Sequence, residues 1–105
     1  MGEEFQYSDH ALRRMAQRGI SEQEIHYVCQ YGRCYHVAGS VYFFLGRKDI
    51  PDRDRNDPSV QRLEGTTVLV DRSNTAVVVT VYRNRQASRQ IRRKSKHDFR
   101  KQGVH

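Results

Sequence analysis

The chain has 105 residues, of which 36% are hydrophobic and 30% are charged, and its formal net charge is +7. This length allows one domain with one modest core, so a second catalytic domain within these residues is excluded. No apolar run approaches the roughly 18 residues of a membrane-spanning helix, and the acidic, polar start is unlike a signal peptide. We therefore expect a cytoplasmic protein whose two cysteines are reduced.

The first predicted element is a helix from about His10 to Arg18. Ser8 or Asp9 caps its start, and Gly19, which reaches positive φ easily, ends it. At about 100° per residue, one face of this helix is polar and carries His10, Arg14 and Arg18, flanked by Arg13 and Gln17. The opposite side carries the apolar residues Leu12, Met15 and Ala16.

A second helix and several strands follow. Ser21 and Glu24 form a capping box at the start of the second helix, and Gly32 ends it. Alternating and β-branched residues then predict four strands, which are Arg33 to Val37, Val41 to Leu45, Thr66 to Asp71, and Thr75 to Tyr82. Two N-terminal helices before such strands indicate an α+β fold, in which the helices pack on an antiparallel sheet of about four strands.

The last strand predicts a division between two faces of the sheet. Strict alternation directs Val77, Val79 and Val81 toward the helices and places Thr80 and Tyr82 on the other face. Before the last two strands, residues 46–65 are rich in charges and breakers. In that segment Asp57 and Pro58 predict a short helical turn, and the clustered aspartates predict a solvated loop.

The positive charge is concentrated at the C-terminus. Residues 1–82 contain ten Lys/Arg against eleven Asp/Glu, whereas residues 83–105 contain nine against one. We divide the chain into a domain over residues 1–85 and a basic extension over 86–105. The residues expected to bind nucleic-acid phosphates are Arg83, Arg85, Arg89, Arg92, Arg93, Lys94 and Lys96. A solubilising tail, or an arm for an acidic partner, remains an alternative interpretation.

Two groups of side chains have the chemistry of a site. The imidazole of His10 beside Arg14 and Arg18 suits proton transfer at a phosphate, although a solvated helix face has the same composition. His26, Cys29, Cys34 and His36 have the ligand types for zinc, but their spacing matches no strong signature, so we predict no metal. Nucleotide-binding glycine motifs are absent from the sequence, and we predict no cofactor.

Two segments carry a family resemblance, and they are Ser8-x-His10-Ala11-Leu12-x-Arg14-Met15-x-x-Arg18-Gly19-Ile20-Ser21 and Val79-Thr80-Val81-Tyr82-Arg83-Asn84. Through them the chain resembles the bacterial and phage-associated family of domain of unknown function 4258. That family is similar to small toxin ribonucleases of the barnase, colicin and RelE kind, whose helices pack on a four-stranded antiparallel sheet. The resemblance implies that His10 and Arg18 meet Thr80 and Tyr82 at one RNA-cleaving site.

Together these features predict a metal-independent, toxin-like endoribonuclease. His10 is expected to act as acid and base, Arg14 and Arg18 to contact the scissile phosphate, and Thr80 and Tyr82 to position RNA. The alternatives are a nucleic-acid-binding module without catalysis and an interaction domain for an antitoxin or another acidic partner. Residues 46–65 and the basic extension exceed the simplest toxin pattern, and we expect them to set the substrate, bind an antitoxin, or form a homodimer interface. No membrane partner is expected.

Overall fold

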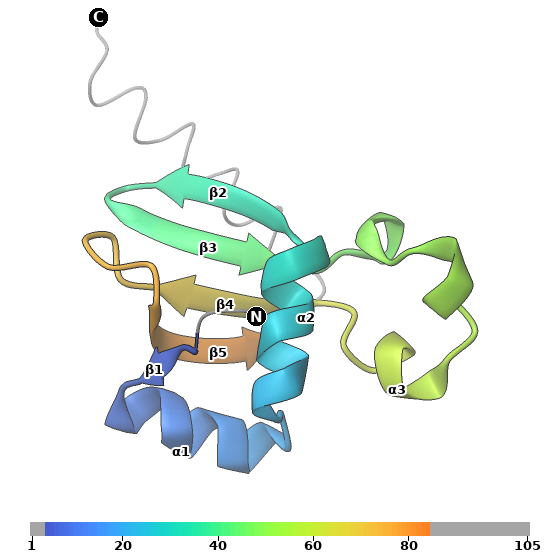
Figure 1. The fold of residues 1–105 in the computed structure, drawn as a ribbon, viewed down its shortest axis with the longest axis horizontal. Helices are drawn as coiled ribbons and strands as arrows, with labels where there is room; N and C mark the ends of the chain where they lie inside the picture. The colour runs from blue at the N-terminus through green and yellow to red at the C-terminus, as the bar shows by residue number, and fades with distance from the viewer. Residues whose placement is uncertain (1–3, 85–105) are drawn as a thin grey trace, which may run out of the picture.

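The computed structural model describes residues 4–84, which form an α+β fold (Figure 1). The helices and strands are β1 (Gln6–Tyr7), α1 (Asp9–Arg18), α2 (Glu22–Tyr31), β2 (Arg33–Val37), β3 (Ser40–Phe44), α3 (Pro58–Gln61), β4 (Thr66–Val70) and β5 (Val77–Arg83), with two 3-10 turns, η1 (Arg47–Asp49) and η2 (Asp52–Asp54), between β3 and α3. No helix in this part of the chain is long and apolar enough to cross a membrane. The predicted basic extension, residues 86–105, lies outside the described residues.

One sheet of five strands organises the domain, in the order β1-β5-β4-β3-β2. The four predicted strands are present, and neighbours among them pair antiparallel. The fifth strand, β1, has only two residues and pairs parallel with the start of β5. A two-residue strand has too few positions for an alternating pattern, so no sequence pattern predicts it.

The two N-terminal helices begin and end where local sequence signals predict. The Ser8 hydroxyl accepts a hydrogen bond from the Ala11 amide at 3.0 Å, and α1 ends at Gly19, whose φ is +65°. The capping box is also present, since the Ser21 amide donates to Glu24 Oε1 at 2.9 Å and the Glu24 amide donates to Ser21 Oγ at 3.2 Å. These bonds satisfy amides at the helix starts that have no partner within the helix.

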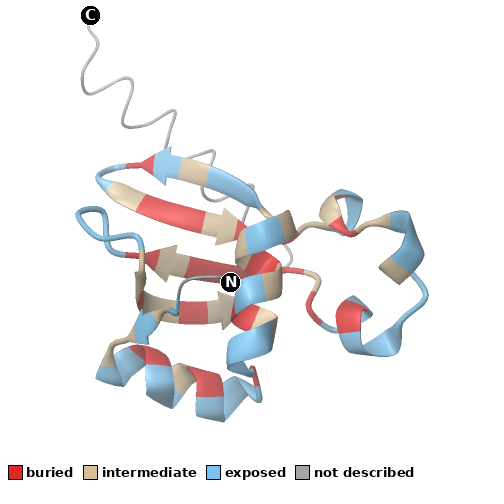
Figure 2. Cartoon of the chain, in the orientation of Figure 1, coloured by how far each residue is buried: buried red, intermediate tan, exposed pale blue. Residues whose placement is uncertain are grey.

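Both N-terminal helices cover the same face of the sheet and enclose the main core. Helix α1 packs along β5, and α2 contacts β3 and β4 (Figure 1). Buried residues occur on both helices and on the strands (Figure 2), and they form one core cluster. Members of this core include Ala11, Met15, Ile25, Val28, Val41, Leu45, Val68, Val70, Val78 and Val81.

The buried side of α1 differs from the predicted one. Ala11 is fully buried and Met15 is 7% exposed, whereas Leu12 is 49% exposed and Ala16 is exposed as well. The direction from the helix axis to the core therefore passes between Ala11 and Met15, about 80° from the position of Leu12. This rotation places Arg14 and Arg18 next to the buried stripe, because they lie within about 100° of it on the helical wheel.

The faces of β5 also differ from those predicted by strict alternation. Leu69 pairs with Thr80 but Val70 pairs with Val78, so Val79 is an extra residue in the strand. Such a bulge breaks the two-residue period. Val78 and Val81, three positions apart, are the fully buried residues of β5, and the prediction that Val77, Val79 and Val81 share the helix-facing side was wrong.

Ser8 is expected to hold α1 on β5. Its hydroxyl both caps α1 and donates to the Val79 carbonyl oxygen at 2.7 Å. Ser8→Ala removes both bonds, so we expect the free energy of unfolding to fall by about 1–2 kcal/mol, as measured by urea denaturation. Ser73→Ala is the matched control, because Ser73 is exposed and its hydroxyl has no hydrogen bond to the described residues. Equal stability of the two variants would contradict this role.

Candidate functional site

The polar flank of α1 is the first half of the predicted site. His10 lies exposed in the first turn, Arg14 is half-buried, and Arg18 is the exposed last residue. Leu12 lines a hollow with Glu22 and His26, so its flank of the helix faces α2. The flank that carries His10, Arg14 and Arg18 therefore lies on the other side of the buried stripe, away from α2.

Thr80 and Tyr82 form the second half of the predicted site. Both are half-buried on β5, and their side chains lie on the sheet face opposite to the helices, because Val81 between them points into the helix-covered core. Burial raises the pKa of the Tyr82 phenol above its ordinary value, and the nearby Tyr42 raises it further. A hydrogen bond with Thr67, its register partner on β4, acts in the opposite direction and lowers this pKa.

The first half lies on α1, which packs along β5, whereas the second half lies on the face of β5 that is opposite to the helices. Helix α1 lies along this strand, and β1 pairs only with Val77 and Val78. From Val79 onward, the α1-side edge of β5 has no partner strand among residues 4–84. No hydrogen bond or ion pair within this range joins the α1 flank to Thr80 or Tyr82. A ligand that contacts both halves therefore has to pass around the edge of β5.

The local charge at this edge is positive. Within the described residues, the ion pairs are Arg33–Asp49, Arg55–Asp52 and Arg62–Glu24, so Arg14, Arg18 and Arg83 have no carboxylate partner there. Arg83, the last residue of β5, is half-buried. The remaining predicted nucleic-acid-binding residues, Arg85, Arg89, Arg92, Arg93, Lys94 and Lys96, lie outside the described residues.

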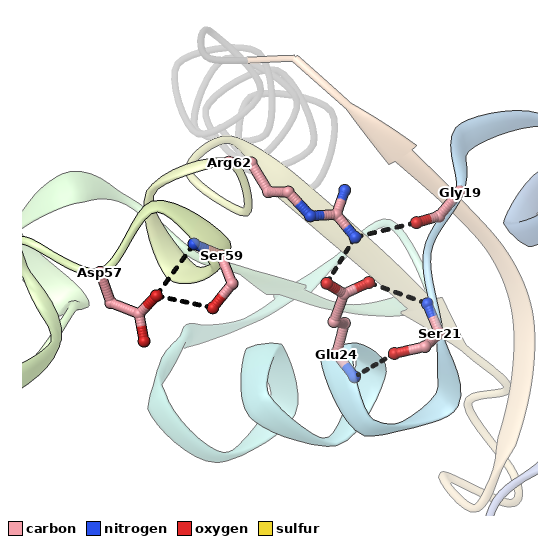
Figure 3. Close-up of polar contacts among 6 residues, drawn as sticks. All are labelled: Gly19, Ser21, Glu24, Asp57, Ser59 and Arg62. Carbon is pink, nitrogen blue, oxygen red and sulfur yellow. Dashed lines mark hydrogen bonds and ion pairs between the residues drawn. The ribbon is translucent and has the colours of Figure 1, made fainter.

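A polar junction that the sequence did not predict holds the end of α1 (Figure 3). Arg62, just after α3, donates to the Gly19 carbonyl oxygen at 2.9 Å and to Glu24 Oε2. Glu24 also accepts the Ser21 amide with its other oxygen. The capping box was visible in the sequence, but its arginine partner is 38 positions away and had no local signal. This junction fixes the helix end that carries Arg18.

The segment between β3 and β4 is attached to α2 by tyrosines. The Tyr27 hydroxyl donates to Asp54 Oδ2 at 2.7 Å, and Arg53 Nη2 donates to the Tyr31 hydroxyl at 2.7 Å. Burial raises the pKa of Tyr27, and the hydrogen bond to Asp54 raises it further.

The aspartates of this segment are partly solvated, as the sequence predicted, since Asp52 and Asp57 are exposed, but several of them also take part in hydrogen bonds and ion pairs. Asp49 accepts the Gly46 amide at 2.8 Å and pairs with Arg33, while Asp57 caps α3 by accepting the Ser59 amide at 3.0 Å. Because their oxygens are used in caps and pairs, these carboxylates organise the loop.

The His/Cys pattern is divided between two surroundings. Cys29 is largely buried on α2, and His26 lies against the Phe5 ring with 4.7 Å between centroids. Cys34 and His36 lie exposed on β2, where Sγ and Nε2 are 3.5 Å apart. Within residues 4–84, no three His, Cys, Asp or Glu side chains group closely enough to hold a metal ion.

Comparison with protein families matched residues 7–83 to the family described as "Domain of unknown function (DUF4258)". The matched range contains α1, α2, strands β2 to β5, and the segment between β3 and β4. Neither the curated proteins nor the solved structures gave a match to the chain.

The two cysteines should differ in chemical reactivity. Burial raises the pKa of Cys29 to about 12, with a smaller contribution from Cys34; partial burial also raises the pKa of Cys34, but by less, and Cys34 as a residue is exposed. Because the thiolate is the reactive form, iodoacetamide at pH 8 should alkylate Cys34 and leave Cys29 unmodified in the folded protein. Mass spectrometry should find one adduct natively and two in urea, with Cys34→Ser as the control that gives none natively. Two native adducts formed at equal rates would rule out the buried position of Cys29.

Proposed function

The chain belongs to the DUF4258 family, and from the geometry of α1 and β5 we propose that it is a metal-independent endoribonuclease of the toxin type, acting in the cytoplasm. In this proposal His10 transfers protons, Arg14 and Arg18 bind and stabilise the scissile phosphate, and Thr80 and Tyr82 position the RNA. The proposal includes a relationship to RelE-like and barnase-like ribonucleases.

The observation that carries the proposal is the unpaired polar flank of α1. An exposed imidazole, a half-buried arginine and an exposed arginine lie on one rigid helix, which Ser8 joins to β5. Cleavage of RNA without metal requires a base for the 2′-hydroxyl, an acid for the leaving oxygen, and cations for the phosphorane charge. His10 has a side chain of the acid and base type, and Arg14 and Arg18 are cations that no carboxylate of the described residues neutralises.

The β5 residues have complementary roles in this proposal. The Tyr82 hydroxyl donates a hydrogen bond to the RNA, and the Thr80 hydroxyl, two positions earlier, lies on the same sheet face. RNA that runs around the free edge of β5 would reach both of them from the α1 flank. The arginines and lysines that follow β5 in the sequence would bind further phosphates and make the affinity dependent on salt.

A nucleic-acid-binding module without catalysis is the second candidate function. It is favoured by the aromatic residues on the sheet face opposite to α1 and α2, where the half-buried Tyr35 and Tyr82 lie on the same face as the buried Tyr42. Tyrosine rings on a sheet can stack with unpaired bases. An acidic antitoxin is the protein partner that this basic chain would suit, and the folded segment between β3 and β4 is where we propose that it contacts the domain.

The ribonuclease proposal predicts a specific pattern of loss among variants of α1. Full-length protein should cleave single-stranded RNA in EDTA, and His10→Ala should lower the rate by about 10²- to 10⁴-fold because the proton-transfer group is lost. Arg14→Gln and Arg18→Gln should lower it by about 10- to 100-fold through weaker phosphate binding. The measurement is the initial rate of cleavage of a 5′-labelled RNA.

Arg13→Gln is the matched control for these arginine variants. It removes the same charge from the same helix, but Arg13 is exposed and lies outside the flank of His10, Arg14 and Arg18. Its rate should stay within about threefold of the wild type. Equal cleavage by all variants would reveal a contaminating nuclease, and tight RNA binding without any cleavage would favour the second candidate function.

A further inference from the structure

Two polar side chains lie opposite each other where β4 begins and β5 ends. Thr66 and Arg83 are register partners across this antiparallel pair. The pair two positions along, Val68 and Val81, is fully buried in the helix-covered core. Since side chains two positions apart share a face, Thr66 and Arg83 also point to the helix-covered side of the sheet.

These two side chains are desolvated and lack partners. Arg83 Nε and Nη2 and Thr66 Oγ1 are buried atoms, and they have no hydrogen-bond partner within residues 4–84. Thr66 as a residue is 0% exposed. Leaving a buried donor unsatisfied costs free energy, and the cost is larger for a charged group. The arrangement is therefore incomplete without an acceptor.

The described carboxylates do not supply that acceptor. Arg83 takes part in none of the ion pairs of residues 4–84. Glu24 is the carboxylate of the nearby α1–α2 junction, and it uses one oxygen for the Ser21 amide and the other for Arg62 (Figure 3). The guanidinium of Arg83 is consequently an uncompensated cation beside a free hydroxyl. Arg83 as a residue is half-buried, so part of its side chain reaches solvent, whereas Thr66 is fully buried.

We propose that Arg83 and Thr66 form a subsite for a phosphate group, in which two guanidinium nitrogens and the threonine hydroxyl donate to its oxygens. A planar guanidinium matches a phosphate through paired hydrogen bonds, and a hydroxyl beside it adds a third donor. The subsite is independent of the ribonuclease proposal, because it binds phosphate whether or not the chain cleaves RNA. Free phosphate and the phosphodiester of a nucleic acid present the same oxygens to it.

The test is a titration of the full-length protein, followed by NMR at the Nε–Hε signals of its arginines. One arm uses inorganic phosphate at constant ionic strength, with chloride as the reference, and the other uses a deoxydinucleoside monophosphate, which lacks the 2′-hydroxyl needed for cleavage. We expect the Arg83 signal to shift saturably with at least one ligand, while the Arg72 signal does not. Tighter binding of the dinucleotide identifies a nucleic acid as the source of the phosphate, and tighter binding of inorganic phosphate identifies a free phosphate.

Three variants separate the subsite from general charge. Arg83→Gln should weaken phosphate binding by about tenfold or more, and the near-isosteric Thr66→Val by about threefold to tenfold. Arg72→Gln removes the same charge from the exposed β4–β5 turn and should change the affinity by less than about twofold. If Arg83→Gln does not fold, the wild-type titration and Thr66→Val still decide the question. Equal, non-saturating shifts at Arg83 and Arg72, or equal affinity in Thr66→Val and wild type, would overturn the proposal.

Discussion

The attachment of Ser8 to the edge of β5 is the constraint on which the rest of the domain depends. The Ser8 amide donates to the Val78 carbonyl oxygen at 3.0 Å, and the Ser8 hydroxyl donates to that of Val79 at 2.7 Å. Successive carbonyl groups of a regular strand point to opposite edges, so one residue can bind both only where the strand is irregular. The bulge at Val79 provides that irregularity. A single serine thereby ends β1, caps α1 and sets where the helix starts on the sheet.

This attachment gives the two faces of the sheet different roles. On one face, Ala11 and Met15 of α1 meet Val78 and Val81, and the apolar core closes over them. On the other face, tyrosines from β2 and β3 form a smaller apolar cluster near Tyr82. Strand β5 contributes to both faces, and its edge beyond Val79 has no partner strand within residues 4–84. The candidate functional residues gather around this edge because α1 and β5 are packed there.

The distribution of charge partners explains how a nearly neutral domain presents a positive edge. Residues 1–82 contain slightly more acidic than basic residues, yet Glu24, Asp49, Asp54 and Asp57 are occupied by helix caps, tyrosines and arginines. Most of these bonds lie at α2 or in the segment between β3 and β4. Arg14, Arg18 and Arg83 have no carboxylate partner in the described part of the chain. Net charge alone would not have revealed the positive edge, because the local charge depends on which carboxylates already bond to other groups.

The sequence by itself determined the local elements of this protein. The N-cap of α1, the capping box of α2, Asp57 before Pro58, and the β-branched runs each lie within a few contiguous residues, and all four predict elements that are present. Tertiary structure alone decided how those elements face one another. One extra residue in β5 changes which valines lie in the core. The packing of α1 buries Ala11 and leaves Leu12 exposed, and Arg62 bonds to Glu24, which is 38 positions away in the sequence. Caps and alternation are local interactions, whereas the register of a bulged strand and the rotation of a docked helix are set by contacts between distant residues.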